Sequence, residues 1–209
     1  VEGDDIFAPV PKSYPAKMTS LLYHRFKHFG GDTERGVAVV CCELIEDNGS
    51  TLREYVLRHA QANNLEQEFV DWLKESCCFC DSLVDRIVSG KPSEEVDLGY
   101  EDNLINTSEY FYLFVIEGER DERLPFDKLY DGVKFVPSVK PYRTIKVRIL
   151  NGAHTSRIPY AMLENIETVG DCMDDANMCD FVKHCVYDEI IPTLDLPKDE
   201  LLSYANDVF

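Results

Sequence analysis

The sequence predicts an α/β region over residues 1–139, followed by an all-α region over residues 140–209. Two observations predict the α/β region. Residues 36–42 form a continuous apolar run, which is typical of a strand buried on both faces of a parallel sheet. Residues 109–117 and 133–136 are rich in the aromatic and β-branched residues that favour strands. The third observation is that the sequence beyond residue 140 reads as helical to the end.

Composition and charge exclude several classes of protein. The chain has 209 residues, of which 44% are hydrophobic and 11% aromatic, enough for a packed core. Its net charge of −18 argues against a nucleic-acid partner, because few cations are available to neutralise phosphates. No apolar run approaches the roughly 20 residues that span a bilayer, and the start is not a signal peptide. We therefore expect a cytoplasmic protein without a membrane or nucleic-acid partner.

The first half of the chain predicts three helices around the buried strand. Residues 15–29 form an amphipathic helix with Pro15 in its first turn, and the Gly30-Gly31 pair ends it. A polar loop follows the strand, and we expect Ser50 to cap a helix over residues 52–61. A second helix over residues 65–75 carries the only tryptophan.

The second half predicts strands first and then helices. Residues 79–90 place Asp85 and Arg86 between apolar residues, where a structural salt bridge is the plain explanation, and the acidic stretch that follows them is irregular. A helix begins near residue 140 and runs to about residue 164, with Pro159 bending it. Two further helices are expected, over residues 172–190 and from Pro197 to residue 208.

The cysteines and two histidines raise the question of a metal site. The eight cysteines occur as adjacent pairs, one C-x-C and isolated residues, which is poor geometry for disulfides and lacks paired zinc-ligand units. Buried reduced thiols are the expected state. His24 and His28 are four residues apart, but no third ligand accompanies them. We therefore expect no metal, and a metal-binding module is the weakest of the alternatives.

Three residues with carbonyl chemistry lie in the helix that begins near residue 140. In a regular α-helix, Asn151 lies about 140° and His154 about 80° around the axis from Lys146, so all three fit one broad face. The apolar residues Ile145, Ile149 and Leu150 lie beside them. We expect these three to hold the helix against a core and to have no catalytic role.

The three side chains have complementary roles in reducing a carbonyl group. Desolvation can lower the pKa of a lysine toward neutrality, so that it exchanges a proton with an alkoxide. An asparagine amide donates to an oxygen that is gaining charge, and a histidine orients or donates. The alternative is structural, with a surface lysine, a helix-interrupting Asn-Gly and a histidine in a local hydrogen bond.

The motif Lys146-x-x-x-x-Asn151-x-x-His154 resembles the catalytic motif of the mannitol dehydrogenase family. Residues 79–89, which include Val84-Asp85-Arg86-Ile87, resemble a second signature of that family. The resemblance implies that residues 1–139 are the C-terminal part of a Rossmann-like NAD-binding domain. It also implies that residues 140–209 begin a helical domain for substrate binding and catalysis. In this family NAD is the cofactor, no metal is needed, and the lysine is the general acid/base.

The resemblance also implies roles for individual residues. Asp85 would lie near the nicotinamide. The asparagine that follows the Cys-acidic pair in mannitol dehydrogenases is Leu44 here, so Asn48 is the substitute that we expect to hold the cofactor or the reacting oxygen. Several separated segments resemble the sugar-acid reductases of the family most closely. A sugar-acid substrate needs a guanidinium for its carboxylate, and the candidates are Arg143, Arg148 and Arg157.

One expected feature is missing from the sequence. No G-x-G-x-x-G occurs, so the chain lacks the tight turn that cradles the pyrophosphate of a dinucleotide. We expect the chain to be the middle of a longer enzyme. A related dehydrogenase of another sugar acid or polyol, and a folded but catalytically incompetent fragment, are the alternatives. The sequence predicts no oligomeric state.

Overall fold

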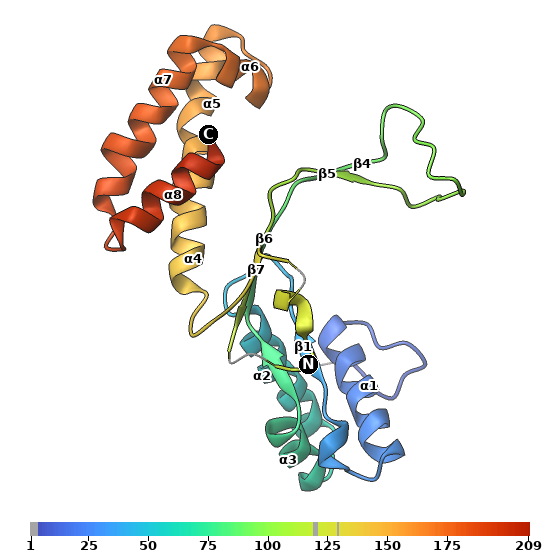
Figure 1. Cartoon of the computed structure of the whole chain (residues 1–209). Coiled ribbons are helices and arrows are strands. Elements are labelled where there is room, and N and C mark those ends of the chain that lie inside the picture. The colour runs from blue at the N-terminus through green and yellow to red at the C-terminus, as the bar shows by residue number, and fades with distance from the viewer. Residues whose placement is uncertain (1–3, 119–120, 129) are drawn as a thin grey trace. The chain divides into compact units, whose positions relative to one another are not determined.

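The computed structural model describes residues 4–118, 121–128 and 130–209 (Figure 1). The first three residues, which belong to the start of the chain discussed above, lie outside the described part. The chain divides into two compact units, residues 1–139 and 140–209, and each is described by itself. Unit 1 mixes helices with strands and unit 2 is helical. This confirms the predicted fold class.

Two parallel strands and three helices form the first part of unit 1. The order is α1 (Tyr14–His28), β1 (Ala38–Val40), α2 (Asn48–Ala62), α3 (Gln67–Glu75) and β2 (Cys78–Cys80). Strands β1 and β2 pair in parallel, and α2 and α3 provide the crossover that a parallel pair requires. The strand predicted over residues 36–42 is therefore shorter than expected, and its three residues are half-buried rather than buried on both faces.

The helices of unit 1 enclose an aromatic core. Phe26, Phe69 and Trp72 have ring centroids 5.4 to 6.3 Å apart. The Trp72 indole N–H donates to the Asp32 carbonyl over 2.9 Å, which satisfies the one polar atom of the ring. The buried residues of this core are Leu22, Phe26, Cys41, Leu52, Val56, Ala60, Phe69, Val70, Trp72, Leu73 and Cys77.

A second sheet and a ribbon complete unit 1. Strand β6 (Leu113–Glu117) lies between β3 (Ser82–Asp85), which is antiparallel to it, and β7 (Val133–Val136), which is parallel. Strands β4 (Val88–Gly90) and β5 (Thr107–Ser108) form a two-stranded ribbon that extends away from the other strands of unit 1 (Figure 1). The unit also contains two 3-10 turns, η1 (Thr33–Arg35) and η2 (Pro125–Lys128). Strand β7 matches its predicted range, whereas β6 begins four residues later than expected.

Unit 2 is built from helices that include two π-helical segments. Its elements are α4 (Lys140–Ile145), the π segment η3 (Lys146–Asn151), α5 (Gly152–Glu164), α6 (Val169–Asp174), α7 (Ala176–His184), the π segment η4 (Cys185–Ile190), the 3-10 turn η5 (Ile191–Thr193) and α8 (Lys198–Val208). Elements α4, η3 and α5 follow one another without a break, and so do α7, η4 and η5. The helix predicted to end near residue 164 does so, with Pro159 inside it.

The core of unit 2 is aliphatic. Its buried residues are Ile145, Ile149, Ala153, Ala161, Cys172, Met178, Val182, Val186, Ile191, Leu201 and Ala205. The helix predicted over residues 172–190 is divided, because Asp175 ends α6 and caps α7. Among the described residues, we find no helix with the length and apolar character that crossing a membrane requires.

Candidate active site

The three predicted catalytic residues lie along one continuous run of helix in unit 2. Lys146 opens the π segment η3 and is half-buried, and Asn151 closes it and is exposed. His154 follows in the first turn of α5 and is half-buried. The structure therefore brings these three residues onto consecutive turns of one element.

The π segment changes the angular relation that a regular helix would give them. The Gly152 N–H bonds to the carbonyls of Val147 and Ile149, and the first of these bonds spans five residues. In a π turn, the N–H of residue i+5 rather than of residue i+4 bonds to the carbonyl of residue i, so each residue turns less far around the axis than in an α-helix. Asn151 is therefore rotated back toward Lys146 instead of lying about 140° around the axis, which is the position in an α-helix. This widened turn is not evident in the sequence, and π segments are frequent at functional sites.

A stripe of residues spaced four apart anchors the helix that carries the three candidate residues. Ile145 is 6% exposed and Ile149 is fully buried, which confirms the expectation that they hold the helix against a core. Leu150 is half-buried. Gly152 packs against the second π segment, since a Cβ there would lie 3.2 Å from the Ile190 side chain. The backbone that carries Lys146 and Asn151 is thus held from its opposite side.

A backbone contact indicates the tautomer of the His154 ring. Its Nδ1 lies 2.8 Å from the Leu150 carbonyl oxygen, which can only accept, so Nδ1 carries a hydrogen. Nε2 is the nitrogen left for a ligand. It accepts a hydrogen bond when the ring is neutral and donates one only when the ring is an imidazolium.

The three candidate arginines differ in exposure. Arg143 in α4 is half-buried and Arg148 in η3 is exposed, so both guanidinium groups lie within reach of solvent. Arg157 is only 6% exposed, because it continues the buried stripe of the helix between Ala153 and Ala161. The burial of Arg157 indicates that it packs inside unit 2, and it is less suited than Arg143 or Arg148 to bind the carboxylate of a substrate.

In unit 1, the expected cofactor residue Asn48 joins the ends of two strands. Its Nδ2 donates to the carbonyls of Cys41, Glu43 and Ser82 over 2.9 to 3.1 Å. Its Oδ1 accepts from the N–H groups of Gly49 and Ser82, both at 2.9 Å. The side chain is 2% exposed, and these bonds occupy its whole amide. These contacts give Asn48 a structural role at the junction.

The segment that contains Ser82 also occupies the N-terminus of α2. The Asp81 carboxylate accepts from the Ser50 N–H at 3.0 Å and from the Ser50 hydroxyl at 2.6 Å. The helix starts at Asn48, earlier than predicted, and Ser50 binds Asp81 instead of capping the helix itself. A Cβ on Gly49 would lie 2.4 Å from the carbonyl carbon and oxygen of Cys80. The Asp81 carboxylate occupies the position where an anion would bind at the helix N-terminus, and the Cys80 backbone lies against Gly49. This turn therefore does not fit a pyrophosphate.

Two further residues of unit 1 bear on the expected site. Asp85 ends β3 opposite Leu113 of β6 and is half-buried. Leu44, which stands where mannitol dehydrogenases have an asparagine, is 84% exposed. Sequence reasoning missed Asp81, because only the fold brings it to a helix 31 residues earlier in the chain.

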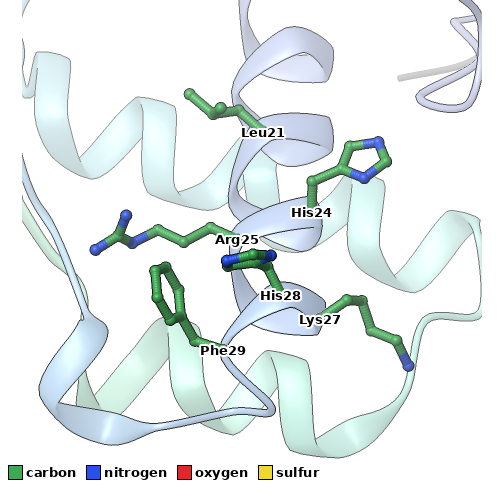
Figure 2. Close-up of a pocket in the computed structure, with 6 residues that line it drawn as sticks. All are labelled: Leu21, His24, Arg25, Lys27, His28 and Phe29. Atoms are coloured by element: carbon green, nitrogen blue, oxygen red, sulfur yellow. The ribbon is translucent and has the colours of Figure 1, made fainter.

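The two histidines of α1 show no metal geometry. Figure 2 shows His24 and His28 beside Arg25, Lys27 and Phe29 at the C-terminal end of the helix, where they line a shallow depression. Basic side chains there complement the helix dipole. Within the described ranges, no group of three or more His, Cys, Asp or Glu residues could hold a metal ion.

Two family models together match most of the chain. The mannitol dehydrogenase Rossmann domain matches residues 3–128, and the mannitol dehydrogenase C-terminal domain matches residues 138–209. The altronate oxidoreductases of Enterobacter sp. (strain 638) and Yersinia enterocolitica are 50% and 48% identical to the chain. Each alignment covers 99% of this chain and 44% of the relative, so the chain spans less than half of the curated relatives it matches.

Solved structures show the same fold. A substrate-free D-sorbitol dehydrogenase is 26% identical, with a TM-score of 0.74, over 95% of this chain and 41% of its own. The Pseudomonas fluorescens mannitol 2-dehydrogenase, solved with NAD and D-mannitol, is 24% identical, with a TM-score of 0.68, over 95% of this chain and 40% of its own. The two domain matches, together with the α/β architecture of unit 1 and the helical architecture of unit 2, lead to one conclusion: the chain belongs to the mannitol dehydrogenase family.

Proposed function

We propose that this chain provides the acid–base and substrate-binding residues of an NAD-dependent, metal-independent oxidoreductase that reduces D-tagaturonate to D-altronate. One observation supports the proposal: Lys146 and Asn151 are the first and last residues of the π segment η3, and His154 follows in the first turn of α5. The family membership and the names of the relatives that are about 50% identical support the substrate class.

Lys146 acts as the general acid. When the keto carbon is reduced, negative charge develops on its oxygen, and the ammonium group stabilises this charge and then donates a proton. A half-buried side chain suits this role, because it is shielded from bulk water and still reachable by substrate. The ammonium provides the positive charge that a metal ion provides in other dehydrogenases, so the mechanism needs no metal.

Asn151 and His154 position the substrate around that lysine. The Asn151 amide N–H donates to the reacting oxygen, which holds the carbonyl beside the ammonium. The bond from His154 Nδ1 to the Leu150 carbonyl gives the neutral ring an accepting Nε2. His154 therefore accepts from a substrate hydroxyl when neutral and polarises the carbonyl only as an imidazolium.

The carboxylate distinguishes a sugar acid from a polyol. Arg143 or Arg148 binds it, because a guanidinium can donate two parallel hydrogen bonds to a carboxylate. Both lie within one turn of Lys146 along the chain, and both retain access to solvent.

A nicotinamide nucleotide supplies the hydride in this chemistry. Asp85 remains the candidate residue beside the nicotinamide. The N-terminus of α2 does not fit the phosphates, because the Asp81 carboxylate binds Ser50 there and Gly49 lies against the backbone of Cys80.

A chimaera tests the proposal directly. Residues 1–209 replace the matching segment of the Enterobacter altronate oxidoreductase, and NADH oxidation is followed with D-tagaturonate, D-fructuronate and D-fructose. The proposal predicts the highest kcat/KM with D-tagaturonate. Preference for D-fructuronate or D-fructose would instead support a fructuronate reductase or a mannitol 2-dehydrogenase. A folded chimaera without activity would support a catalytically incompetent module.

A further inference from the structure

Two thiols on strand β2 are in contact. Side chains two apart on a strand project from the same face, so Cys78 and Cys80 lie side by side. Their Sγ atoms are 3.3 Å apart, in a hydrogen bond in which either thiol can be the donor. All eight cysteines lie in the described part of the chain and are free, and in that part this is the one hydrogen bond between two sulfurs.

The two thiols differ in access. Cys80 is 4% exposed and packs in a cluster with Ile116, Leu124 and Val133. Cys78 is half-buried at the edge of the same cluster. A small molecule can therefore reach the Cys78 thiol, whereas the Cys80 thiol is buried next to it.

The hydrogen bond also separates the acidities of the two thiols. It lowers the pKa of Cys78, because the Cys80 thiol donates to the Cys78 thiolate, and it raises the pKa of Cys80. Asp121 raises the pKa of Cys78, whereas Arg123 and Arg53 lower it. The thiolate is the reactive form of cysteine, so Cys78 is the better nucleophile of the pair.

We propose that Cys78 and Cys80 form a reversible oxidation site, at which hydrogen peroxide converts the two thiols to an intramolecular disulfide. In the first step, the Cys78 sulfur attacks one peroxide oxygen. An S–O bond forms, the O–O bond breaks, and the departing hydroxide takes a proton to become water.

The second step uses the neighbouring thiol. The Cys80 sulfur attacks the Cys78 sulfur, the S–S bond forms and the S–O bond breaks. The hydroxyl group leaves as water with the proton of Cys80. In total, two thiols and one peroxide give one disulfide and two waters, so the sulfurs are oxidised and the peroxide is reduced.

The backbone allows this bond at a modest cost. Residues two apart on a strand have Cα atoms roughly 6.6 Å apart, near the upper end of the range of about 4.4–6.8 Å found in disulfides. A small bend of β2 closes that distance, and β2 pairs only with β1 in the described sheet. The bend is transmitted to Gly49, which packs on the Cys80 carbonyl at the start of α2.

Peptide mapping of the 209-residue chain tests the proposal. Trypsin cleaves after Lys74 and Arg86 and releases residues 75–86, which contain Cys77, Cys78 and Cys80. After peroxide treatment, quenching and denaturation, we expect this peptide to bind one N-ethylmaleimide, at Cys77, instead of three. Without alkylation it should be about 2 Da lighter than the reduced peptide, through loss of two hydrogens. Dithiothreitol should restore the uptake of three.

Cysteine-to-serine variants show which thiol takes part in each oxidation step. Cys42→Ser, which removes an exposed thiol, should leave the result unchanged. Cys80→Ser should stop at a sulfenic acid on Cys78, which dimedone traps. Three maleimides after oxidation, a bridge to Cys77, or a covalent dimer through Cys42 would each overturn the proposal. The wild-type map decides the question even where a variant does not fold.

Discussion

Asn48 shows how much of unit 1 depends on a single side chain. It links the loop after β1 to the start of β3 and to its own helix through five hydrogen bonds. The Ser82 hydroxyl adds a bond to the Cys41 carbonyl at the same junction. From the sequence, Asn48 is identifiable as a polar residue after a buried strand, but its partners are not, because Ser82 lies 34 residues away.

Gly49 gives the first prediction at this scale. Gly49→Ala should lower the free energy of unfolding by about 1–3 kcal/mol, because its Cβ would meet the backbone of Cys80 and Asp81 at 2.4 to 2.7 Å. Gly170→Ala is the matched control. Its Cβ would lie 3.8 Å from the nearest atom, inside a helix where alanine is preferred. Urea unfolding of both variants provides the comparison, and equal midpoints would contradict the predicted close approach.

His59 gives a prediction about pH. It is 1% exposed in α2, and its Nδ1 finds no hydrogen-bond partner among the described residues. Burial lowers the pKa of His59, although Asp4 opposes this shift. Below about pH 6.5, His59 binds a proton in the unfolded chain but remains neutral to a lower pH in the folded chain. Stability should therefore fall as the pH drops below that value.

The variant His59→Leu separates this histidine from the others. Between pH 7 and pH 5, the urea midpoint of the variant should fall less than that of the wild type. His24→Gln removes an exposed histidine of α1 and should behave like the wild type. An identical pH dependence in all three proteins would contradict the account of His59.

At the scale of elements, sequence periodicity predicts the helices better than their interruptions. The amphipathic helix over residues 15–29 appears as α1 within one residue at each end, since Pro15 and the glycine pair fix its limits. The π segment η3 could not be predicted, because the spacing of apolar residues does not distinguish a short π turn from the α-helix around it. The sequence does not predict the break at Asp175 between α6 and α7, because the apolar spacing continues across it.

Asp175 is the residue that makes this break. Its side chain accepts from the Met178 N–H at 2.8 Å, and its own backbone is extended. Asp175→Ala should lower the free energy of unfolding by about 0.5–2 kcal/mol, as expected for loss of an N-cap. Asp174→Ala, which removes the neighbouring exposed carboxylate at the end of α6, should change it little. Thermal unfolding of the pair tests this, and equal losses would contradict a capping role.

At the scale of the whole molecule, the change of architecture near residue 139 was evident in the sequence. The described structure divides there into an α/β unit and a helical unit, and the two family domains match residues 3–128 and 138–209. The helical motif could be predicted because its residues are close in sequence. The junction of Asn48, Asp81 and Ser82 could not, because it joins two segments that lie 34 residues apart in the chain.

The central claim is that Lys146 exchanges the proton in a reaction of this family. In the chimaera with the Enterobacter enzyme, Lys146→Ala should lower kcat for D-tagaturonate at least roughly 100-fold. Lys146→Arg should be nearly as slow, because arginine keeps the charge but does not release its proton. Lys183→Ala, which removes an exposed lysine of α7, is the control.

The measurement is kcat across the pH range for these three variants and the unmodified chimaera. The account predicts wild-type rates for Lys183→Ala and slow turnover at every pH for both changes at Lys146. Near-normal turnover of Lys146→Ala at all pH values would contradict the assignment of Lys146.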